Sequence, residues 1–263
     1  MLNKLLKYDL KWMFKFLSIF YILGLFFAVL TRLFLKVDNS LFMNIVGEIT
    51  RGAAFSMIFS ALVNNLLRLW VKFRQSVYGD ESYLTHTLPV KKSSIYLSKM
   101  LTAVITVFAS FAVIILALLI LYYSKVNLEA LKNYFLPFLD VFNISLAGVL
   151  TLLFLVLFLE FINILQCGLT GIIIGHRFNN NKTGMSVLFG FICYSISQII
   201  IVILMFIPAI FNSDIMNIFV TTDALNFGIL KPVVIYSVVS YTLINIAGLF
   251  INIKIFNKGV NVD

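Results

Sequence analysis

Long apolar runs are the feature of this sequence that most limits what the chain can fold into. A helix that crosses the hydrocarbon core of a bilayer needs about 20 mostly apolar residues. Six segments meet this requirement, at about 17–35, 45–70, 100–123, 146–174, 185–211 and 232–253. Of the 263 residues, 61% are hydrophobic and 12% charged, which is more apolar surface than one soluble core can hide. The sequence therefore predicts an all-α integral membrane protein with six transmembrane helices.

Proline positions agree with these spans. Pro137 and Pro232 come just before the fourth and sixth spans, where a missing amide N–H costs little. Pro208 comes near the end of the fifth span, where we expect it to kink or end the helix.

Basic residues are distributed unevenly over the segments that join the spans. If the N-terminus is cytoplasmic, most of the 20 lysines and arginines fall on the cytoplasmic side. The positive-inside rule then places both termini, the segment 72–99 and the loop 175–183 in the cytoplasm. The net charge of +9 indicates this orientation and contact with anionic membrane lipid, and not nucleic-acid binding.

Two flanking segments have a character of their own. In residues 1–16, four lysines recur at i+3 and i+4 spacing and apolar residues cover most of the remaining surface. This pattern predicts either an amphipathic interfacial helix on the inner leaflet or a plain basic flank of the first span. The segment 212–231 remains semi-apolar, which predicts a folded outer cap or a re-entrant segment. The outer segments are short, so we expect no extracellular domain.

The residues that enzymes use are sparse and scattered. Cys167 and Cys193 lie in apolar runs without a Cys or His at ligand spacing, so we expect neither a disulfide framework nor a metal site. His86 and His176 lie in loops and have no metal-binding partner nearby in the sequence. The chain also has no phosphate-binding P-loop. We therefore expect a transport protein that is not an enzyme, and energy from an ion gradient or from another subunit.

One acidic residue lies near the middle of the fourth span. Glu160 is followed by Asn163 and Gln166 on an adjoining face of the expected helix. A charged residue at the centre of a bilayer costs about 2.5–3.5 kcal/mol on insertion scales, so such residues usually face protein or water. Glu160 is either a substrate-pathway or proton-relay group, or a hydrogen-bonded carboxyl that holds the helices together.

A row of polar residues also runs along the second span. Ser56, Ser60, Asn64 and Arg68 follow one another at i+4 spacing. Small and polar residues in one row favour close helix–helix packing, including packing in a dimer interface. The more specific alternative is that these four residues line a pore.

The polar segment 72–99, between the second and third spans, predicts a short helix of its own. Gly79 breaks the helix that descends from the second span, and Asp80 or Ser82 can cap a new one. The new helix runs from about residue 81 to 88 and stops at Pro89.

This short helix carries apolar side chains in a polar environment. Tyr83, Leu84 and Leu88 are its large apolar residues. A linker does not need them, whereas exposed aromatic and aliphatic side chains on a rigid element are typical of protein interfaces. The segment is therefore predicted to dock onto a partner.

The same segment resembles the ABC-2-type transporter permeases of bacteria. The resemblance rests on the pattern R-x-S-x-Y-G-x-E-x-Y-L-T-x-T-L-P-V, and the six-span layout and the amphipathic N-terminus agree with it. The residues of the pattern are Arg74, Ser76, Tyr78, Gly79, Glu81, Tyr83, Leu84, Thr85, Thr87, Leu88, Pro89 and Val90. Importer permeases have a related loop, but theirs is typically alanine-rich after its Glu. The stretch ESYLTHTLP is not, which favours an exporter.

The resemblance implies an ABC-2-type exporter fold in which residues 1–263 form a single permease domain. It implies two copies of a separate ATPase subunit, which bind ATP and Mg²⁺, while this chain binds no cofactor. A second permease copy or a sister permease would complete the pathway in a bacterial cytoplasmic membrane. The coupling helix would contact the ATPase through Tyr78, Gly79, Asp80, Glu81, Tyr83, Leu84, Thr87, Leu88 and Pro89.

The expected substrate is an amphipathic or hydrophobic molecule, with a peptide such as a toxin or an antimicrobial peptide as the first choice. The main alternative is a secondary transporter or channel that uses Glu160 and needs no ATPase. An intramembrane enzyme is disfavoured because the catalytic residue sets are missing.

Overall fold

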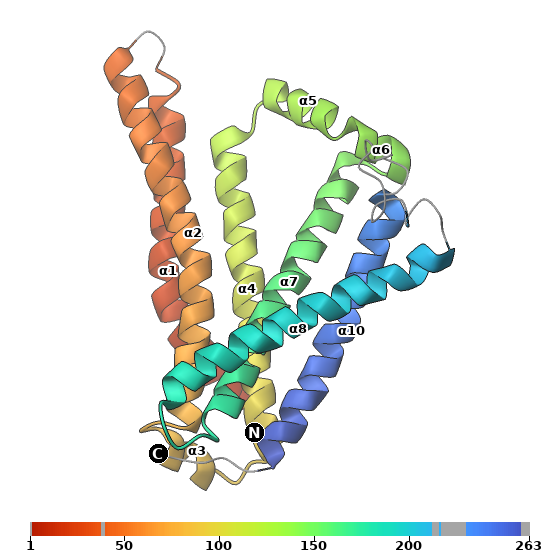
Figure 1. The fold of residues 1–263 in the computed structure, drawn as a ribbon. Coiled ribbons are helices and arrows are strands. Elements are labelled where there is room, and N and C mark those ends of the chain that lie inside the picture. Colours follow the sequence, from red (N-terminus) through yellow and green to blue (C-terminus); the bar gives the residue numbers. More distant parts are fainter. Residues whose placement is uncertain (1, 38–39, 212–215, 217–229, 259–263) are drawn as a thin grey trace. The chain divides into compact units, whose positions relative to one another are not determined.

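The computed structural model describes residues 2–37, 40–211, 216 and 230–258. Every regular element within these residues is a helix (Figure 1). The helices are α1 (Leu2–Phe34), α2 (Leu41–Val77), α3 (Ser82–Thr87), α4 (Lys92–Tyr122), α5 (Lys125–Tyr134), α6 (Leu136–Phe142), α7 (Leu146–Gly175), α8 (Lys182–Phe211) and α10 (Leu230–Asn257). The prediction of an all-α chain is confirmed for this part of the sequence.

Six of these helices are long and apolar enough to cross a membrane: α1, α2, α4, α7, α8 and α10. They coincide with the six predicted spans and identify the chain as a multi-pass membrane protein. Most of them extend beyond the apolar runs, because the helical backbone continues into the polar flanks. Pro208 lies inside α8 in its last turn, and Pro137 lies in the first turn of α6.

The structure bears differently on the predictions for the two flanking segments, 1–16 and 212–231. Residues 2–16 continue into the first span within the single helix α1, with no break between them. Their predicted position on a membrane surface remains a prediction. The predicted outer cap at 212–231 lies outside the described residues, apart from Met216 and the last two residues of the segment.

By its internal packing the chain divides into two compact units. Unit 1 consists of Met1–Ser76 and Asp80–Leu128, and unit 2 of Val77–Gly79 and Glu129–Asp263. Unit 1 therefore contains α1 to α4, and unit 2 contains α6, α7, α8 and α10. The short segment Val77–Gly79 belongs to unit 2, although the chain on both sides of it belongs to unit 1.

Small and polar side chains hold unit 1 together. Ala28 of α1, Ala54 of α2 and Ala117 of α4 are fully buried in one apolar cluster. Further along α2, Asn65 donates a hydrogen bond of 3.0 Å to Ser110 of α4 and accepts one of 3.0 Å from Thr106. Small residues allow close approach of helices, and buried amides need such partners.

An ion pair connects the beginnings of α1 and α4 in unit 1. The Asp9 carboxylate lies 2.6 Å from the Lys99 ammonium and accepts a further hydrogen bond of 3.0 Å from Ser98. Both charged side chains are largely buried, at 12% and 13% exposure. Loss of either partner would leave a buried charge, so the pair holds the two helices in register.

Glycines allow the closest contact in unit 2, between α7 and α8. A Cβ atom on Gly171 would overlap the backbone of Ser186 and Gly190, and one on Gly175 would overlap Ser186. The two helix backbones therefore touch directly. Between α7 and α10, Thr170 donates a hydrogen bond of 2.7 Å to Asn252, and both residues are buried.

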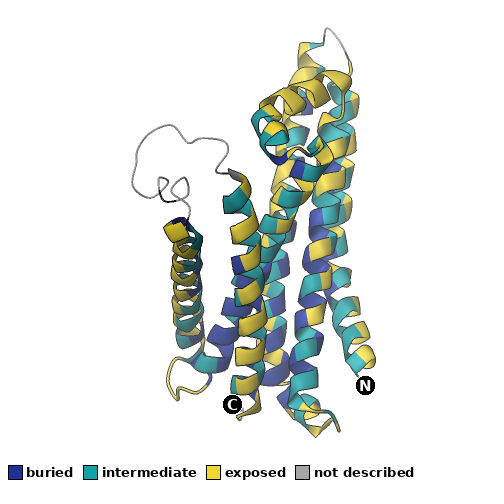
Figure 2. Ribbon diagram, turned by 90° about the vertical axis from the view of Figure 1, so that its right-hand side faces the viewer, coloured by how far each residue is buried: buried dark blue, intermediate teal, exposed yellow. Residues whose placement is uncertain are grey.

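The long helices expose many large apolar side chains. Figure 2 shows buried and exposed residues along the same helices. Exposed positions include large apolar side chains such as Ile22 at 67%, Phe59 at 68% and Phe191 at 69%. A soluble chain would not expose so many of them, whereas lipid is the solvent that suits them.

Candidate functional site

The segment between α2 and α4 folds largely as predicted. α2 ends at Val77, Gly79 follows, and the short helix α3 joins the ends of α2 and α4 (Figure 1). Leu88 is the first residue after α3 and has an extended backbone, as the residue before a proline usually has. The predicted short helix is therefore confirmed.

The predicted cap of this helix is wrong. Neither Asp80 nor Ser82 caps α3: Glu81 occupies the N-cap position and makes no side-chain capping hydrogen bond. The Glu81 carboxylate instead pairs with the Lys72 ammonium of α2, at 2.7 and 2.8 Å. The Lys72 side chain is only 16% exposed, so this ion pair is partly shielded and fixes the beginning of α3 on α2.

The apolar side chains of α3 are exposed. Tyr83 is 75% exposed, Leu84 74%, and Leu88, just after the helix, 43%. They belong to a polar segment that also contains Asp80 and Lys91, so lipid is an unsuitable environment for them. Thr87 and Pro89 are exposed beside them. The segment therefore presents an apolar surface, defined by Tyr83, Leu84 and Leu88.

Tyr78 belongs to the interior and not to this surface. It is 2% exposed, and its ring stacks on the ring of His176 with 4.2 Å between centroids and 25° between planes. His176 follows α7 and donates a hydrogen bond of 2.9 Å from Nδ1 to the Ile172 carbonyl. Burial raises the pKa of the Tyr78 hydroxyl, and the Arg177 guanidinium partly offsets this. Tyr78 is thus held within unit 2 by its contact with His176.

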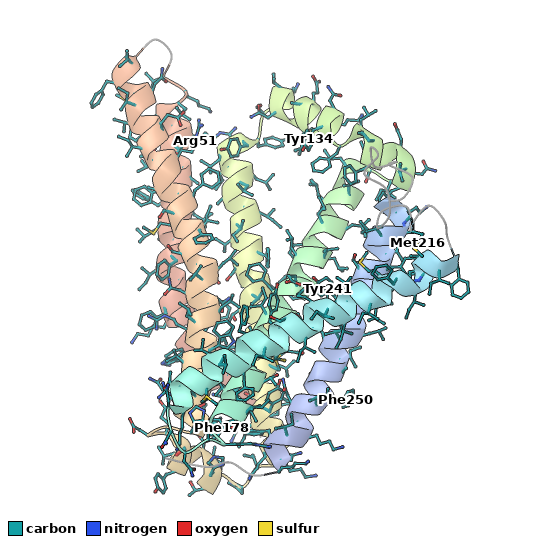
Figure 3. All side chains as sticks on the ribbon, viewed as in Figure 1. Arg51, Tyr134, Phe178, Met216, Tyr241 and Phe250 are labelled. Atoms are coloured by element: carbon teal, nitrogen blue, oxygen red, sulfur yellow. The ribbon has the colours of Figure 1, made fainter. Side chains whose placement is uncertain are left out.

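Glu160 is the centre of a polar cluster that joins three helices of unit 2. Tyr194 of α8 donates a hydrogen bond of 2.6 Å to its Oε1 atom. The amide nitrogen of Gln198 lies 3.2 Å from Oε1 and 3.4 Å from Oε2. The Gln198 carbonyl oxygen accepts a hydrogen bond of 3.3 Å from Tyr241 of α10, labelled in Figure 3. These four residues are called the Glu160 cluster below.

Asn163 and Gln166, predicted beside Glu160, lie deeper in the unit. They are 2% and 4% exposed. The Asn163 carbonyl oxygen accepts a hydrogen bond of 2.9 Å from Ser197. The Gln166 side chain packs against Gly248, where a Cβ atom would meet Gln166 Oε1. Both residues therefore pack helices together and do not join the Glu160 cluster.

The polar row of α2 lies beside the buried face of that helix and not on it. Ser56 is exposed, Ser60 and Asn64 are partly exposed, and the Asn64 amide donates to the Ser60 carbonyl of the same helix. The Arg68 guanidinium carbon lies 3.2 Å from the centre of the Phe16 ring of α1. A second chain or a pore in contact with this row stays a prediction.

Asn65 carries a polar contact from α2 to α4 and was not among the residues predicted from the sequence. It is fully buried, on one stripe with Ala54, Ile58, Ala61 and Leu69. These positions recur at i+3 and i+4 spacing, which was a usable signal.

Comparison of the chain with protein-family models, with curated proteins and with solved structures gave no match. Within the described residues, no group of three or more His, Cys, Asp or Glu side chains is placed to hold a metal ion.

Proposed function

We propose that this chain is the membrane-spanning permease subunit of an ATP-driven exporter of the ABC-2 type. The observation that carries the proposal is α3: a six-residue helix in a polar connection that exposes Tyr83 and Leu84 at 75% and 74%. The six long apolar helices and the sequence pattern around α3 support the same function.

In this proposal α3 is the coupling helix, and its apolar surface is seated on an ATPase subunit. ATP and Mg²⁺ bind to two ATPase subunits, and this chain pairs with a second copy or a sister permease. Closure of the ATPases moves the coupling helices and shifts the permeases from an inward-facing to an outward-facing state. The Lys72–Glu81 pair ties α3 to α2, which makes α3 suited to transmit such a movement.

Purification from the membranes of the native cell in a mild detergent tests this function. We expect a P-loop ATPase to accompany the chain, and we expect Mg²⁺-dependent ATP hydrolysis by the complex but not by the chain alone. Transport should cease when ATP is depleted and continue when a protonophore dissipates the proton gradient. The opposite pattern would favour the secondary transporter, whose supporting observation is the carboxylate of the Glu160 cluster.

The proposed orientation makes a labelling prediction. Cysteines introduced at Gln75 and Asn180 should react with a membrane-impermeant maleimide only after permeabilisation, and a cysteine at Asn127 should react in intact cells. All three positions are exposed. The background should lack Cys167 and Cys193, which are free thiols. Labelling of Gln75 in intact cells would contradict a cytoplasmic coupling helix.

A further inference from the structure

The hydrogen bonds of the Glu160 cluster all run towards the carboxylate. Tyr241 donates to Gln198, Gln198 donates to Glu160, and Tyr194 donates to Glu160. An ionised carboxylate accepts hydrogen bonds and donates none, so this arrangement suits a negatively charged group. Glu160 is therefore the acceptor of two side chains of α8, and one of these, Gln198, accepts in turn from Tyr241 of α10.

No basic side chain neutralises this carboxylate in the part of the chain that the structure describes. The ion pairs among the described residues involve other acids, namely Asp9, Glu48 and Glu81. Glu160 has hydroxyl and amide partners instead. An acid within a membrane span is expensive, and hydrogen bonds from neutral groups leave its net charge in place.

The Glu160 cluster is also partly open. Each of its four residues is partly exposed, in contrast to Asn163 and Gln166 on the same helix. Among the described residues, Oε2 of Glu160 accepts the long contact of 3.4 Å from Gln198, and a carboxylate oxygen can accept a further donor beside it. The two tyrosine rings add aromatic faces, which attract cations.

A second acceptor lies on α10, on a side chain that packs against the Glu160 turn of α7. Asn245 of α10 is 8% exposed, and its amide nitrogen donates a hydrogen bond of 3.0 Å to the carbonyl of Leu159, the neighbour of Glu160. Its Oδ1 atom is buried and has no hydrogen-bond partner. Buried acceptors are normally satisfied, so one that has no partner among the described residues, one helical turn from Tyr241 on α10, marks a place for a donor from outside the chain.

We propose that the Glu160 cluster binds the positively charged group of a hydrophobic cation. A metal cation such as Ca²⁺ would need about six to eight oxygen ligands, more than one carboxylate and its neighbours supply. An organic cation needs one carboxylate, aromatic faces and apolar surroundings, all of which α7, α8 and α10 provide. The proposal narrows the substrate class of the exporter and to that extent rests on the proposed function. Binding itself needs no ATPase.

A pair of probes with the same shape and opposite charge tests the site. The full chain, purified and reconstituted in lipid nanodiscs, is titrated with tetraphenylphosphonium and with tetraphenylborate, and binding to empty nanodiscs is subtracted. We expect saturable binding of the phosphonium only. In Glu160→Gln, which keeps a hydrogen-bond acceptor but removes the charge, phosphonium affinity should fall about tenfold or more. Glu129→Gln on the exposed helix α5 is the control and should bind like the wild type.

Two results would overturn the proposal. One is a wild-type chain that binds both probes equally or neither, which decides the matter even if Glu160→Gln fails to fold. The other is a folded Glu160→Gln chain that binds the phosphonium as tightly as the wild type. Because the titration contains no ATPase, neither result bears on the coupling role of α3, and a failed ATPase purification does not bear on cation binding.

Discussion

Replacing Tyr83 and Leu84 together by alanine is expected to detach the ATPase from the permease while the membrane helices remain folded. Both side chains are about three-quarters exposed, at 75% and 74%, so their truncation removes little of the internal packing. Apolar anchors at the centre of an interface typically cost about 2 kcal/mol or more each when truncated, which is more than a tenfold loss of affinity. The amount of co-purified ATPase and its substrate-stimulated ATP hydrolysis measure the effect.

Two matched controls separate docking from general damage. Tyr134→Ala removes the same side chain at 78% exposure from α5, and Lys91→Ala removes an exposed residue just beyond Pro89. Both should retain the ATPase. A Tyr83→Ala, Leu84→Ala chain that holds its ATPase as firmly as the wild type and remains coupled would remove α3 from the proposed function.

Gly171→Ala is expected to cause a large loss of stability. Its Cβ atom would overlap the backbone of Ser186 and Gly190, and backbone cannot rotate away as a side chain can. Forcing two packed helices apart typically costs about 1–3 kcal/mol or more. Thermal unfolding in detergent, together with the fraction of monodisperse protein, should show the loss.

Substitutions at two other glycines, Gly190 and Gly52, are expected to have much smaller effects on stability. Gly190→Ala should be far milder, although Gly190 faces Gly171, because its Cβ atom would lie 3.6 Å or more from its neighbours. In Gly52→Ala, the new Cβ atom would meet no neighbouring atom within 4 Å. This substitution should be neutral or stabilising, since alanine is favoured over glycine in a helix by about 0.5–1 kcal/mol. Equal losses for all three variants would contradict direct backbone contact between α7 and α8.

The spans could be predicted because the length of an apolar run is a local property. The helix α3 could be predicted for a similar reason, because Gly79 and Pro89 act on the backbone beside them. The ion pair between Lys72 and Glu81 could not be predicted in this way. Several polar side chains near α3 could cap the helix, and the local sequence does not specify which of them would do so.

The inward face of a membrane helix is harder to predict than its ends. In a soluble helix, polarity separates the two faces, but here both faces are apolar and lipid replaces water. Asn64 and Asn65 are adjacent and chemically identical, yet only Asn65 is buried against α4. Glu160 was identifiable as unusual, but its partners Tyr194 and Gln198 depend on the register of α8 against α7, which no local pattern specifies.

The burial of Tyr78 in unit 2 has a consequence for biosynthesis. The ribosome completes α2 and α3 well before it makes α7 and His176, because these lie much later in the chain. Until then the Tyr78 ring has no His176 ring to stack on. A nascent chain halted before His176 would therefore contain the whole of α3 and its Lys72–Glu81 pair, but not the stacking partner of Tyr78. Stacking of the Tyr78 ring is therefore expected to follow the synthesis of α7 and not that of α3, although Tyr78 itself is made before both.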